Sequence, residues 1–294
     1  MRKSRPSGSA ARSVRRDIQR ISALALIAIF AAAVPYVRAT LASERRADAA
    51  ANLKVAVPAY VFPGQAPLVT LGSMSPAPGL VILNPGNGDA PFSASWQAQA
   101  NVLRARGTVV LGYVHTDHGS RPIPAVEESV NNYLKPASGR IVVSGIFFDE
   151  MSISCTEESY YHQLYQYVRN VDPAAFVADN PGTAVNVCDL RSASTVANTF
   201  VTFEHDAQTY LTQYAGNIVG PTGSHSSGAQ YPAATFWHLI YGASGSQMPQ
   251  LVSLAAARHA GYVYATDGNL PNPWDSVASY VNPEAQTAAA TRPK

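Results

Sequence analysis

The sequence predicts an α/β protein built as a single (β/α)8 barrel of the TIM type. Eight short runs rich in β-branched and aromatic residues lie between residues 53 and 267, and helical patterns separate most of them. Two of these runs, 141–150 and 199–204, end in carboxylates. Catalytic groups of such barrels lie at the carboxyl ends of the strands, where the loops form a common mouth. The chain of 294 residues has room for one barrel of about 250 residues.

Turn signals and hydrophobic periodicity define the elements of the first half. Pro63 and Gly64 end the first strand, and the turn at 85–88 ends the second. Ser93 is a candidate N-cap for a helix whose apolar residues recur at helical spacing. The stretch 141–150 begins as a buried strand does, with almost no polarity. The elements predicted here are strands at 53–60, 79–84, 107–114 and 141–150, and helices at 93–106 and 125–134.

The second half alternates helices and strands in the same way. Thr156 is a candidate cap for the next helix. Glu157 and Glu158 would lie in its first turn, where acidic side chains interact favourably with the positive end of the helix dipole. The last segment, 285–294, is rich in Ala, Thr and Pro, and we expect a disordered tail there. The elements predicted here are helices at 156–170, 205–214 and 250–260, and strands at 175–178, 199–204, 234–241 and 261–267.

Residues 1–39 are predicted to be a signal peptide or an N-terminal membrane anchor. Seven Lys and Arg residues lie among the first twenty, against one acid, and an apolar run follows at 21–34. Small residues near Ala39 make cleavage plausible there. If it stays uncleaved, the segment 21–37 would anchor the chain with its basic end in the cytoplasm. We therefore expect a secreted, periplasmic or cell-surface protein, with a linker at 40–52 and the barrel at 53–284.

The composition is that of a globular protein, with 47% apolar and 14% charged residues. The net charge of +2 comes from the basic N-terminal segment, and the remainder is slightly acidic. We therefore expect no nucleic-acid partner, because such binding needs a basic domain. We expect a monomer.

Cys155 and Cys188 are the only cysteines, and they are 33 positions apart. An even number of cysteines in an exported chain suggests a disulfide, which would stabilise the fold by about 3–4 kcal/mol. The alternative is two unpaired thiols. Without matching histidine spacing the two cysteines make a poor zinc site.

Nearly every predicted strand ends in a hydrogen-bonding or ionisable side chain. Such a mouth suits a polar ligand rich in hydroxyl groups. Aromatic residues at or near the strand ends could stack on sugar rings, or they could fill the core. The candidates for substrate contact are Tyr60, Asn84, Tyr113, His115, Asn180, Trp237, Tyr241 and Asp267.

Three acids at strand ends, Asp149, Glu150 and Glu204, are the candidate catalytic residues. Side chains alternate along a strand, so at most one of the two adjacent acids should point into the mouth. Glycoside hydrolysis needs two carboxyl groups across one bond between sugars. A desolvated acid beside another carboxylate keeps its proton, as the general acid requires. Alternatively, these acids cap helices or pair with arginine at the barrel rim.

Other chemistries have weaker support in the sequence. Asp149, Glu150, His115 and Asp267 could hold a divalent metal, but no His-x-His or His-Glu-x-x-His spacing occurs. The segment 242–245 falls one residue short of the Gly-x-Ser-x-Gly motif of serine hydrolases. No Gly-x-Gly-x-x-Gly follows the first strand, which argues against nucleotide binding. We expect no metal and no organic cofactor.

Six segments, in the same order over residues 53–270, resemble the spherulin-4 (spherulation-specific family 4) proteins. The segments ending in Phe-Phe-Asp-Glu and Thr-Phe-Glu are the specific ones. The six are Val57-Pro58-Ala59-Tyr60, Val81-Ile82-Leu83-Asn84-Pro85, Gly112-Tyr113-Val114-His115-Thr116, Gly145-Ile146-Phe147-Phe148-Asp149-Glu150, Asn180-Pro181-Gly182 and Val201-Thr202-Phe203-Glu204.

The resemblance implies a barrel glycoside hydrolase, similar to a fungal endo-α-1,4-N-acetylgalactosaminidase that acts on galactosaminogalactan. It also implies that the acids after strands four and six are essential, and these match Asp149, Glu150 and Glu204. We expect Asp149 to act as nucleophile or base and Glu204 as general acid, or the reverse, with Glu150 in support. The substrate implied is an aminosugar-containing biofilm exopolysaccharide cleaved internally. The alternative is a non-catalytic carbohydrate-binding or cell-surface barrel.

Overall fold

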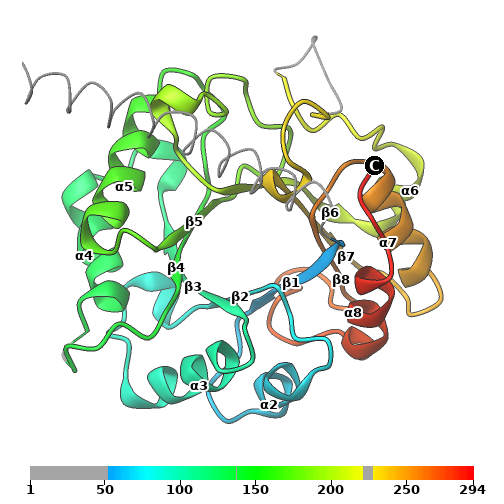
Figure 1. Cartoon of the computed structure of the whole chain (residues 1–294), viewed down its shortest axis with the longest axis horizontal. Helices are drawn as coiled ribbons and strands as arrows, with labels where there is room; N and C mark the ends of the chain where they lie inside the picture. The colour runs from blue at the N-terminus through cyan, green and yellow to red at the C-terminus, as the bar shows by residue number, and fades with distance from the viewer. Residues whose placement is uncertain (1–51, 137, 221–227) are drawn as a thin grey trace, which may run out of the picture. The chain divides into compact units, whose positions relative to one another are not determined.

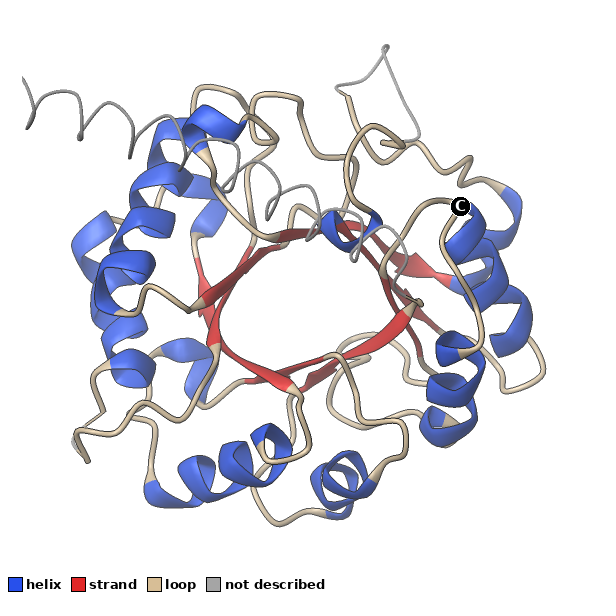
Figure 2. Ribbon diagram, viewed as in Figure 1, coloured by secondary structure: helices blue, strands red, loops and turns tan. Residues whose placement is uncertain are grey.

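The computed structural model describes residues 52–136, 138–220 and 228–294. Its eight strands form a closed barrel in which each strand pairs in parallel with its neighbours in chain order, and β8 closes on β1 (Figure 1). Helices surround this ring of strands (Figure 2). The predicted fold class is confirmed. The strands are β1 (Lys54–Ala59), β2 (Leu80–Leu83), β3 (Val109–His115), β4 (Gly145–Asp149), β5 (Phe176–Asp179), β6 (Thr199–Asp206), β7 (Phe236–Tyr241) and β8 (Tyr262–Ala265).

The helices of the described residues follow the strands in order. Most strand residues are buried, because the barrel interior covers one face of each strand and the helices cover the other. The helix after β1 was not predicted, and the helix after β6 begins two residues later than predicted, because Asp206 still pairs in the strand and then caps the helix. The helices are α2 (Ala66–Ser73), α3 (Ala94–Arg104), α4 (Ile123–Leu134), α5 (Glu158–Val171), α6 (Ala207–Thr212), α7 (Met248–Ala257) and α8 (Val281–Ala289).

A glycine in β3 lets α4 approach the barrel closely. A Cβ on Gly112 would lie 2.4 Å from the ring of Tyr133, so any larger residue would displace that ring. The hydroxyl of Tyr133 donates to the carbonyl of Tyr113 at 2.8 Å. This contact fixes the strand that carries Tyr113 towards the mouth.

The prediction of a disordered tail at 285–294 is wrong. Residues up to Ala289 belong to α8, and Ala285 and Ala288 are buried against the barrel. The backbone N–H of Leu53 donates to the carbonyl of Thr291 at 2.9 Å, which ties this segment to the start of β1. Alanine is the strongest helix former, and its small side chain lets a helix pack closely. The Ala-rich composition therefore belongs to a packed helix.

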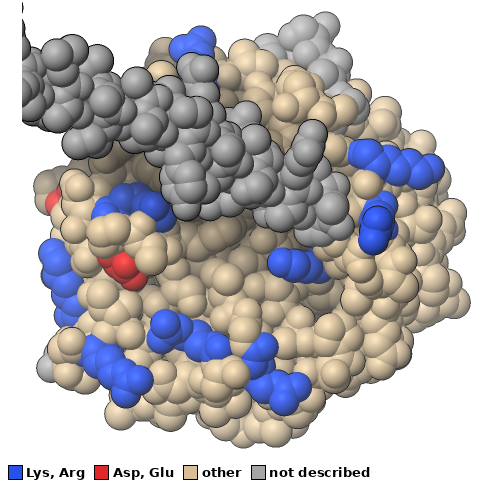
Figure 3. Space-filling model, viewed as in Figure 1, with Lys and Arg blue, Asp and Glu red and all other residues tan. Residues whose placement is uncertain are grey.

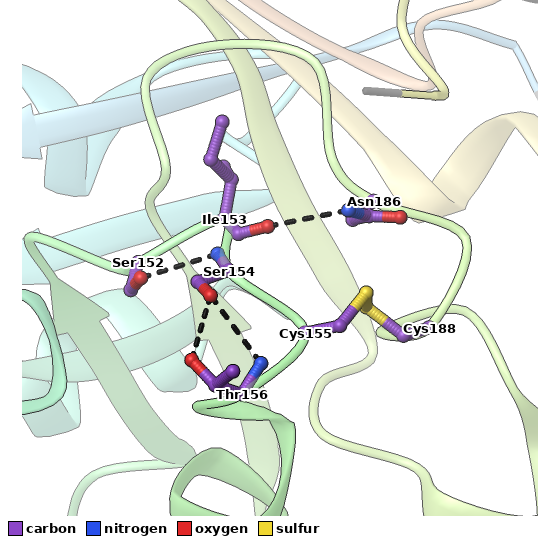
Figure 4. The surroundings of a disulfide bond; sticks show 7 residues. All are labelled: Ser152, Ile153, Ser154, Cys155, Thr156, Asn186 and Cys188. Atoms are coloured by element: carbon purple, nitrogen blue, oxygen red, sulfur yellow. Dashed lines mark hydrogen bonds between the residues drawn. A yellow bond between two sulfur atoms is a disulfide. The ribbon is translucent and has the colours of Figure 1, made fainter. Parts of the chain in front are cut away.

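The predicted disulfide is confirmed. Cys155 and Cys188 are bonded, and they join the loop after β4 to the loop after β5 (Figure 4). Asn186 Nδ2 also donates to the carbonyl of Ile153 at 3.4 Å, beside the bond. These two loops follow the strands that carry the predicted site, so the disulfide holds them together. A disulfide is typical of oxidising compartments and fits an exported protein.

The predicted signal or anchor segment, 1–39, lies outside the described residues, as does the linker apart from Asn52. None of the helices that the structure describes has the length and apolar character needed to cross a bilayer. Figure 3 views the barrel from the end at which the strands begin, and Lys and Arg outnumber Asp and Glu on the visible part of this face.

Candidate active site

Asn180 links the two acids that the sequence places after strands four and six. Its side-chain nitrogen Nδ2 donates to Oδ1 of Asp149 at 2.7 Å and to Oε2 of Glu204 at 2.6 Å. The two oxygens are therefore no farther apart than the sum of these distances. The backbone N–H of Asn180 donates to the carbonyl of Phe148 at 2.8 Å, which fixes it beside the end of β4. The structure thus brings together three of the predicted site residues, Asp149, Asn180 and Glu204.

Two aromatic residues complete the hydrogen bonds of this pair. The hydroxyl of Tyr113 donates to Oδ2 of Asp149 at 2.7 Å, and Nε1 of Trp274 donates to Oε1 of Glu204 at 3.1 Å. Every oxygen of the two carboxyl groups therefore has a donor. Networks of this kind fix side-chain orientation in a low-dielectric site.

Trp274 is a site residue that the sequence reasoning missed. It lies in the loop after β8, and its carbonyl accepts a hydrogen bond from the N–H of Tyr60 at 2.9 Å. This bond joins the loops after β1 and β8 across the closing seam of the barrel. The one signal in the sequence was a tryptophan shortly after the eighth strand. Because the loop has no regular pattern, nothing predicted the direction of its side chain.

Both acids hold their protons more tightly than ordinary carboxyl groups do. Burial and then the charge of Asp149 raise the pKa of Glu204 to about 7, while the bonds from Asn180 and Trp274 oppose the shift. Burial also raises the pKa of Asp149, and the hydrogen bonds from Tyr113 and Asn180 limit the rise. A carboxyl group with a pKa near 7 is partly protonated at neutral pH, as a general acid requires.

Glu150 points away from this pair, as the alternation of side chains predicts. Its backbone lies in the left-handed region, with φ 59°, and its Oε2 accepts from the N–H of Asp117 at 3.1 Å. Nδ1 of His115 lies 3.9 Å from the same oxygen. A strained conformation at a strand end is common at functional sites. Glu150 therefore belongs to the rim of the mouth.

A second polar cluster, on the rim after β2 and β3, contains two of the candidates for substrate contact. Nε2 of His115 lies 3.7 Å from Asp89, whose other oxygen accepts from Arg121 at 2.8 Å. Asn84 donates to Asn87 Oδ1 at 3.3 Å. None of these side chains bonds Asp149 or Glu204 directly in the part of the chain that the structure describes.

The aromatic candidates divide between mouth and core. Tyr60 lies edge-on to Tyr113 with ring centroids 5.5 Å apart, and Tyr241 stacks on His205 at 5.9 Å. Trp237, by contrast, is fully buried and packs on Phe147 inside the barrel, so its prediction as a substrate contact is wrong. Trp237 lies near the start of β7, too deep in the barrel for a ligand to reach it.

Asp267 has a structural role in the described residues. Its carboxylate accepts from the hydroxyl of Ser279 at 2.6 Å and from the N–H of Ser279 at 3.3 Å. These bonds hold the end of the loop after β8, which also carries Trp274. Asp267 thus supports that loop and bonds neither of the paired acids.

The chain matches the model of the spherulation-specific family 4 over residues 54–288. Spherulin-4 of Physarum polycephalum is 29% identical over 270 residues, which are 90% of this chain and 77% of that protein.

Two solved structures share the fold. Aspergillus clavatus Sph3, solved in complex with GalNAc, has a TM-score of 0.67 at 22% identity, covering 82% of this chain and 98% of that chain. A cyclic α-maltosyl-(1→6)-maltose hydrolase from Arthrobacter globiformis has a TM-score of 0.50 at 9% identity, covering 83% and 82%. At these identities the similarity establishes the barrel fold alone. The family match covers most of the chain, and the chain therefore belongs to the spherulation-specific family 4.

Proposed function

We propose that this protein is an exported glycoside hydrolase that cleaves within an aminosugar-containing exopolysaccharide. The observation that carries the proposal is the pair of buried acids bridged by Asn180, of which Glu204 has a pKa of about 7. Two carboxyl groups, one of which keeps its proton near neutral pH, are what glycosidic bond cleavage requires. The reaction needs no metal and no organic cofactor.

Glu204 acts as the general acid in this proposal. It donates its proton to the oxygen that leaves as the bond between sugars breaks, while Asp149 attacks the anomeric carbon as nucleophile. Retaining glycosidases hold their carboxyl groups about 5–5.5 Å apart, and inverting enzymes about 6.5–9.5 Å. Because one amide nitrogen bonds both acids, the distance between their nearest oxygens stays below the inverting range, which favours retention of configuration. After the first step, ionised Glu204 takes a proton from the water that releases the product.

Two observations support an aminosugar substrate: the ligand of a related structure and the side chains at the strand ends. Sph3 was solved with GalNAc, an N-acetylated aminosugar. Tyr60, Tyr241, Asn84, His115 and Glu150 lie at or just after strand ends, at the same end of the barrel as the acid pair, and their rings and hydrogen-bonding groups suit a sugar polymer.

Product analysis by mass spectrometry tests the proposal. The protein is incubated with N-acetylated and with de-N-acetylated galactosamine polymers, with and without EDTA. We expect shortened oligomers from at least one polymer, and the same products with EDTA. NMR of the fresh products should show retained anomeric configuration. Loss of cleavage with EDTA would support a metal mechanism instead.

A non-catalytic carbohydrate-binding barrel is the second candidate. It is favoured by one observation: all four oxygens of Asp149 and Glu204 already accept hydrogen bonds, so the acids could serve only to order the mouth. Binding of either polymer without any cleavage product would support this role and exclude the hydrolase.

A further inference from the structure

The charged side chains are segregated between the two ends of the barrel. Helices of a (β/α)8 barrel run antiparallel to its strands, so helix C-termini and strand starts share one end. Nine of the eleven Lys and Arg of the described residues lie at this end, and we call them the basic face. They are Lys54, Arg104, Arg106, Lys135, Arg140, Arg169, Arg258, Arg292 and Lys294.

Contacts confirm this placement for the chain's last residues. Nε of Arg292 donates to Oδ1 of Asn52 at 3.1 Å, directly before β1. The N–H of Lys294 donates to the carbonyl of Ala256 at 3.0 Å, at the end of α7. The start of β1, the end of α7 and the last residues of the chain therefore meet on the basic face.

The positive charge of this face is not neutralised locally. Asp172, which follows α5, is the one acid at a helix end or strand start on this side within the described residues. None of the nine basic residues forms an ion pair with a described acid. All except Arg169 and Arg258 are exposed. Figure 3 shows Lys and Arg side chains spread over the visible part of the surface.

The acids gather at the opposite end, around the mouth. Asp89, Asp117, Glu150, Asp206 and Asp267 all follow strand ends or lie in the loops there. The described residues carry more acids than bases, 16 against 11, so net charge alone conceals the basic face. Any anionic surface would therefore be attracted to one end of the barrel and repelled by the other.

The sequence that leads into β1 points to a lipid surface as the partner. Lys54 begins β1 on the basic face, and the 13 residues of the linker, 40–52, connect it to the predicted signal or anchor segment. Fully extended, such a linker spans about 45 Å. A retained anchor would therefore keep the start of β1, on the basic face, within about 45 Å of the headgroups. Each Lys or Arg near an anionic bilayer adds attraction within a Debye length.

We propose that the basic face docks on a bilayer rich in anionic phospholipid and directs the mouth away from the membrane. In this orientation the acid pair faces the surrounding medium, where a polysaccharide would be met. That consequence rests on the proposed function, whereas docking does not.

Fluorescence in nanodiscs tests the proposal with the full chain. Because Cys155 and Cys188 are bonded, a thiol dye labels a single added cysteine. One dye is placed at Asn101→Cys, exposed near the end of α3, and another at Asp275→Cys, exposed in the loop after β8. Energy transfer to a headgroup acceptor is measured in discs of phosphatidylglycerol or phosphatidylcholine.

We expect strong transfer from position 101 in phosphatidylglycerol at low salt, reversed at high salt, and weak transfer from position 275. Arg140→Gln should weaken docking about fivefold, and the triple variant Arg104→Gln, Arg106→Gln, Arg140→Gln about a hundredfold. Arg121→Gln is the matched control, because it removes one cation from the rim cluster beside Asp89, at the opposite end of the barrel from the basic face. It should leave docking unchanged.

Three results would overturn the proposal: equal transfer in both lipids, stronger transfer from position 275 than from 101, or equal effects of Arg140→Gln and Arg121→Gln. If soluble alginate binds the basic face and energy transfer shows no approach of the protein to either bilayer, the basic face would be assigned to an anionic polymer instead. Because none of these readouts uses catalysis, an inactive protein that docks would refute only the proposed hydrolase function.

Discussion

Glu204 is the residue on which the proposed chemistry depends most directly. Replacing it with Gln preserves size and hydrogen bonding but removes the transferable proton. We expect Glu204→Gln to lower turnover by about 10²–10⁴-fold, the usual contribution of a positioned general acid. Turnover is measured on the polymer cleaved most readily. Glu150→Gln, on the rim, should lower turnover by a smaller factor than Glu204→Gln does. Unchanged turnover in Glu204→Gln, with normal folding by circular dichroism, would remove this residue from the mechanism.

Trp274 tunes the same acid. Its N–H favours the ionised form of Glu204 and so lowers its pKa. Trp274→Phe keeps an aromatic ring but removes this donor, so the pKa of Glu204 should rise. The alkaline limb of the pH–rate profile should therefore move to higher pH.

Tyr241→Phe is the control for Trp274→Phe. It alters a neighbouring ring whose centroid lies 6.5 Å from that of Trp274. Among the described residues, Tyr241 donates no hydrogen bond to Glu204. The alkaline limb of the pH–rate profile should not shift in Tyr241→Phe. If it does not shift in Trp274→Phe either, a group other than Glu204 determines it.

Individual site residues were predictable where a strand ends in them. Asp149 and Glu204 follow long apolar runs, so the barrel rule places both at the mouth. Trp237 and Tyr241 are four residues apart in one strand and share a face, and only depth along the strand separates core from mouth. Depth depends on the tilt and stagger of the strands, which one sequence does not reveal. Trp274 comes from an irregular loop and could not be placed.

At the scale of elements, the regular part of the chain was predicted well. All eight predicted strands exist, because buried parallel strands give uninterrupted apolar runs. The misses lie in α2 and α8, and α2 has a weak amphipathic pattern. In α8 two of the four buried positions are alanines, and an Ala-rich segment resembles a disordered tail in composition.

The disulfide between the loops after β4 and β5 gives a prediction at this scale. Cys155→Ala with Cys188→Ala should lower the free energy of unfolding by about 3–4 kcal/mol, because the closed segment of 33 residues gains freedom in the unfolded chain. Denaturant titration measures this change. Hydrogen exchange should increase in both loops.

Activity should also fall in the disulfide variant, since Asp149 and Asn180 stand at the base of these loops. Dithiothreitol on the wild-type protein is the matched control and should reproduce both effects. Full activity and unchanged exchange in the variant would show that the strands alone position the acids.

For the whole molecule, the buried acids determine how stability depends on pH. Burial raises the pKa of Asp189 to about 7, with the charge of Glu158 adding to the shift, and Glu204 reaches about 7 as well. Burial also raises the pKa values of Asp179 and Glu284 well above their ordinary range. Both oxygens of Asp179 and of Asp189 lack hydrogen-bond partners in the described part of the chain. The folded state therefore favours their neutral forms.

The sign of the effect follows from proton binding. Unfolded carboxyl groups lose their protons near pH 4, whereas these folded groups keep theirs to about pH 7. Burial lowers the pKa of His238 to about 3, which has the opposite effect, but it is one group against four acids. Between about pH 4 and pH 7 the folded state therefore binds more protons than the unfolded chain, so the free energy of unfolding falls as pH rises. Acidic solution should stabilise this protein, in contrast to proteins whose carboxylates form ion pairs.

Denaturant titrations at pH 5 and pH 7.5 measure this slope. Asp189→Asn replaces the acid by a neutral side chain of the same shape. It should reduce the difference in the free energy of unfolding between pH 5 and pH 7.5 by up to about 3 kcal/mol, because each pKa unit corresponds to about 1.4 kcal/mol. Glu204→Gln should act similarly. Glu128→Gln, an exposed acid of α4, is the control and should leave the slope unchanged. If stability instead rises towards neutral pH in the wild-type protein, these acids are ionised in the folded state, and Glu204 would then lack the proton that its proposed role requires.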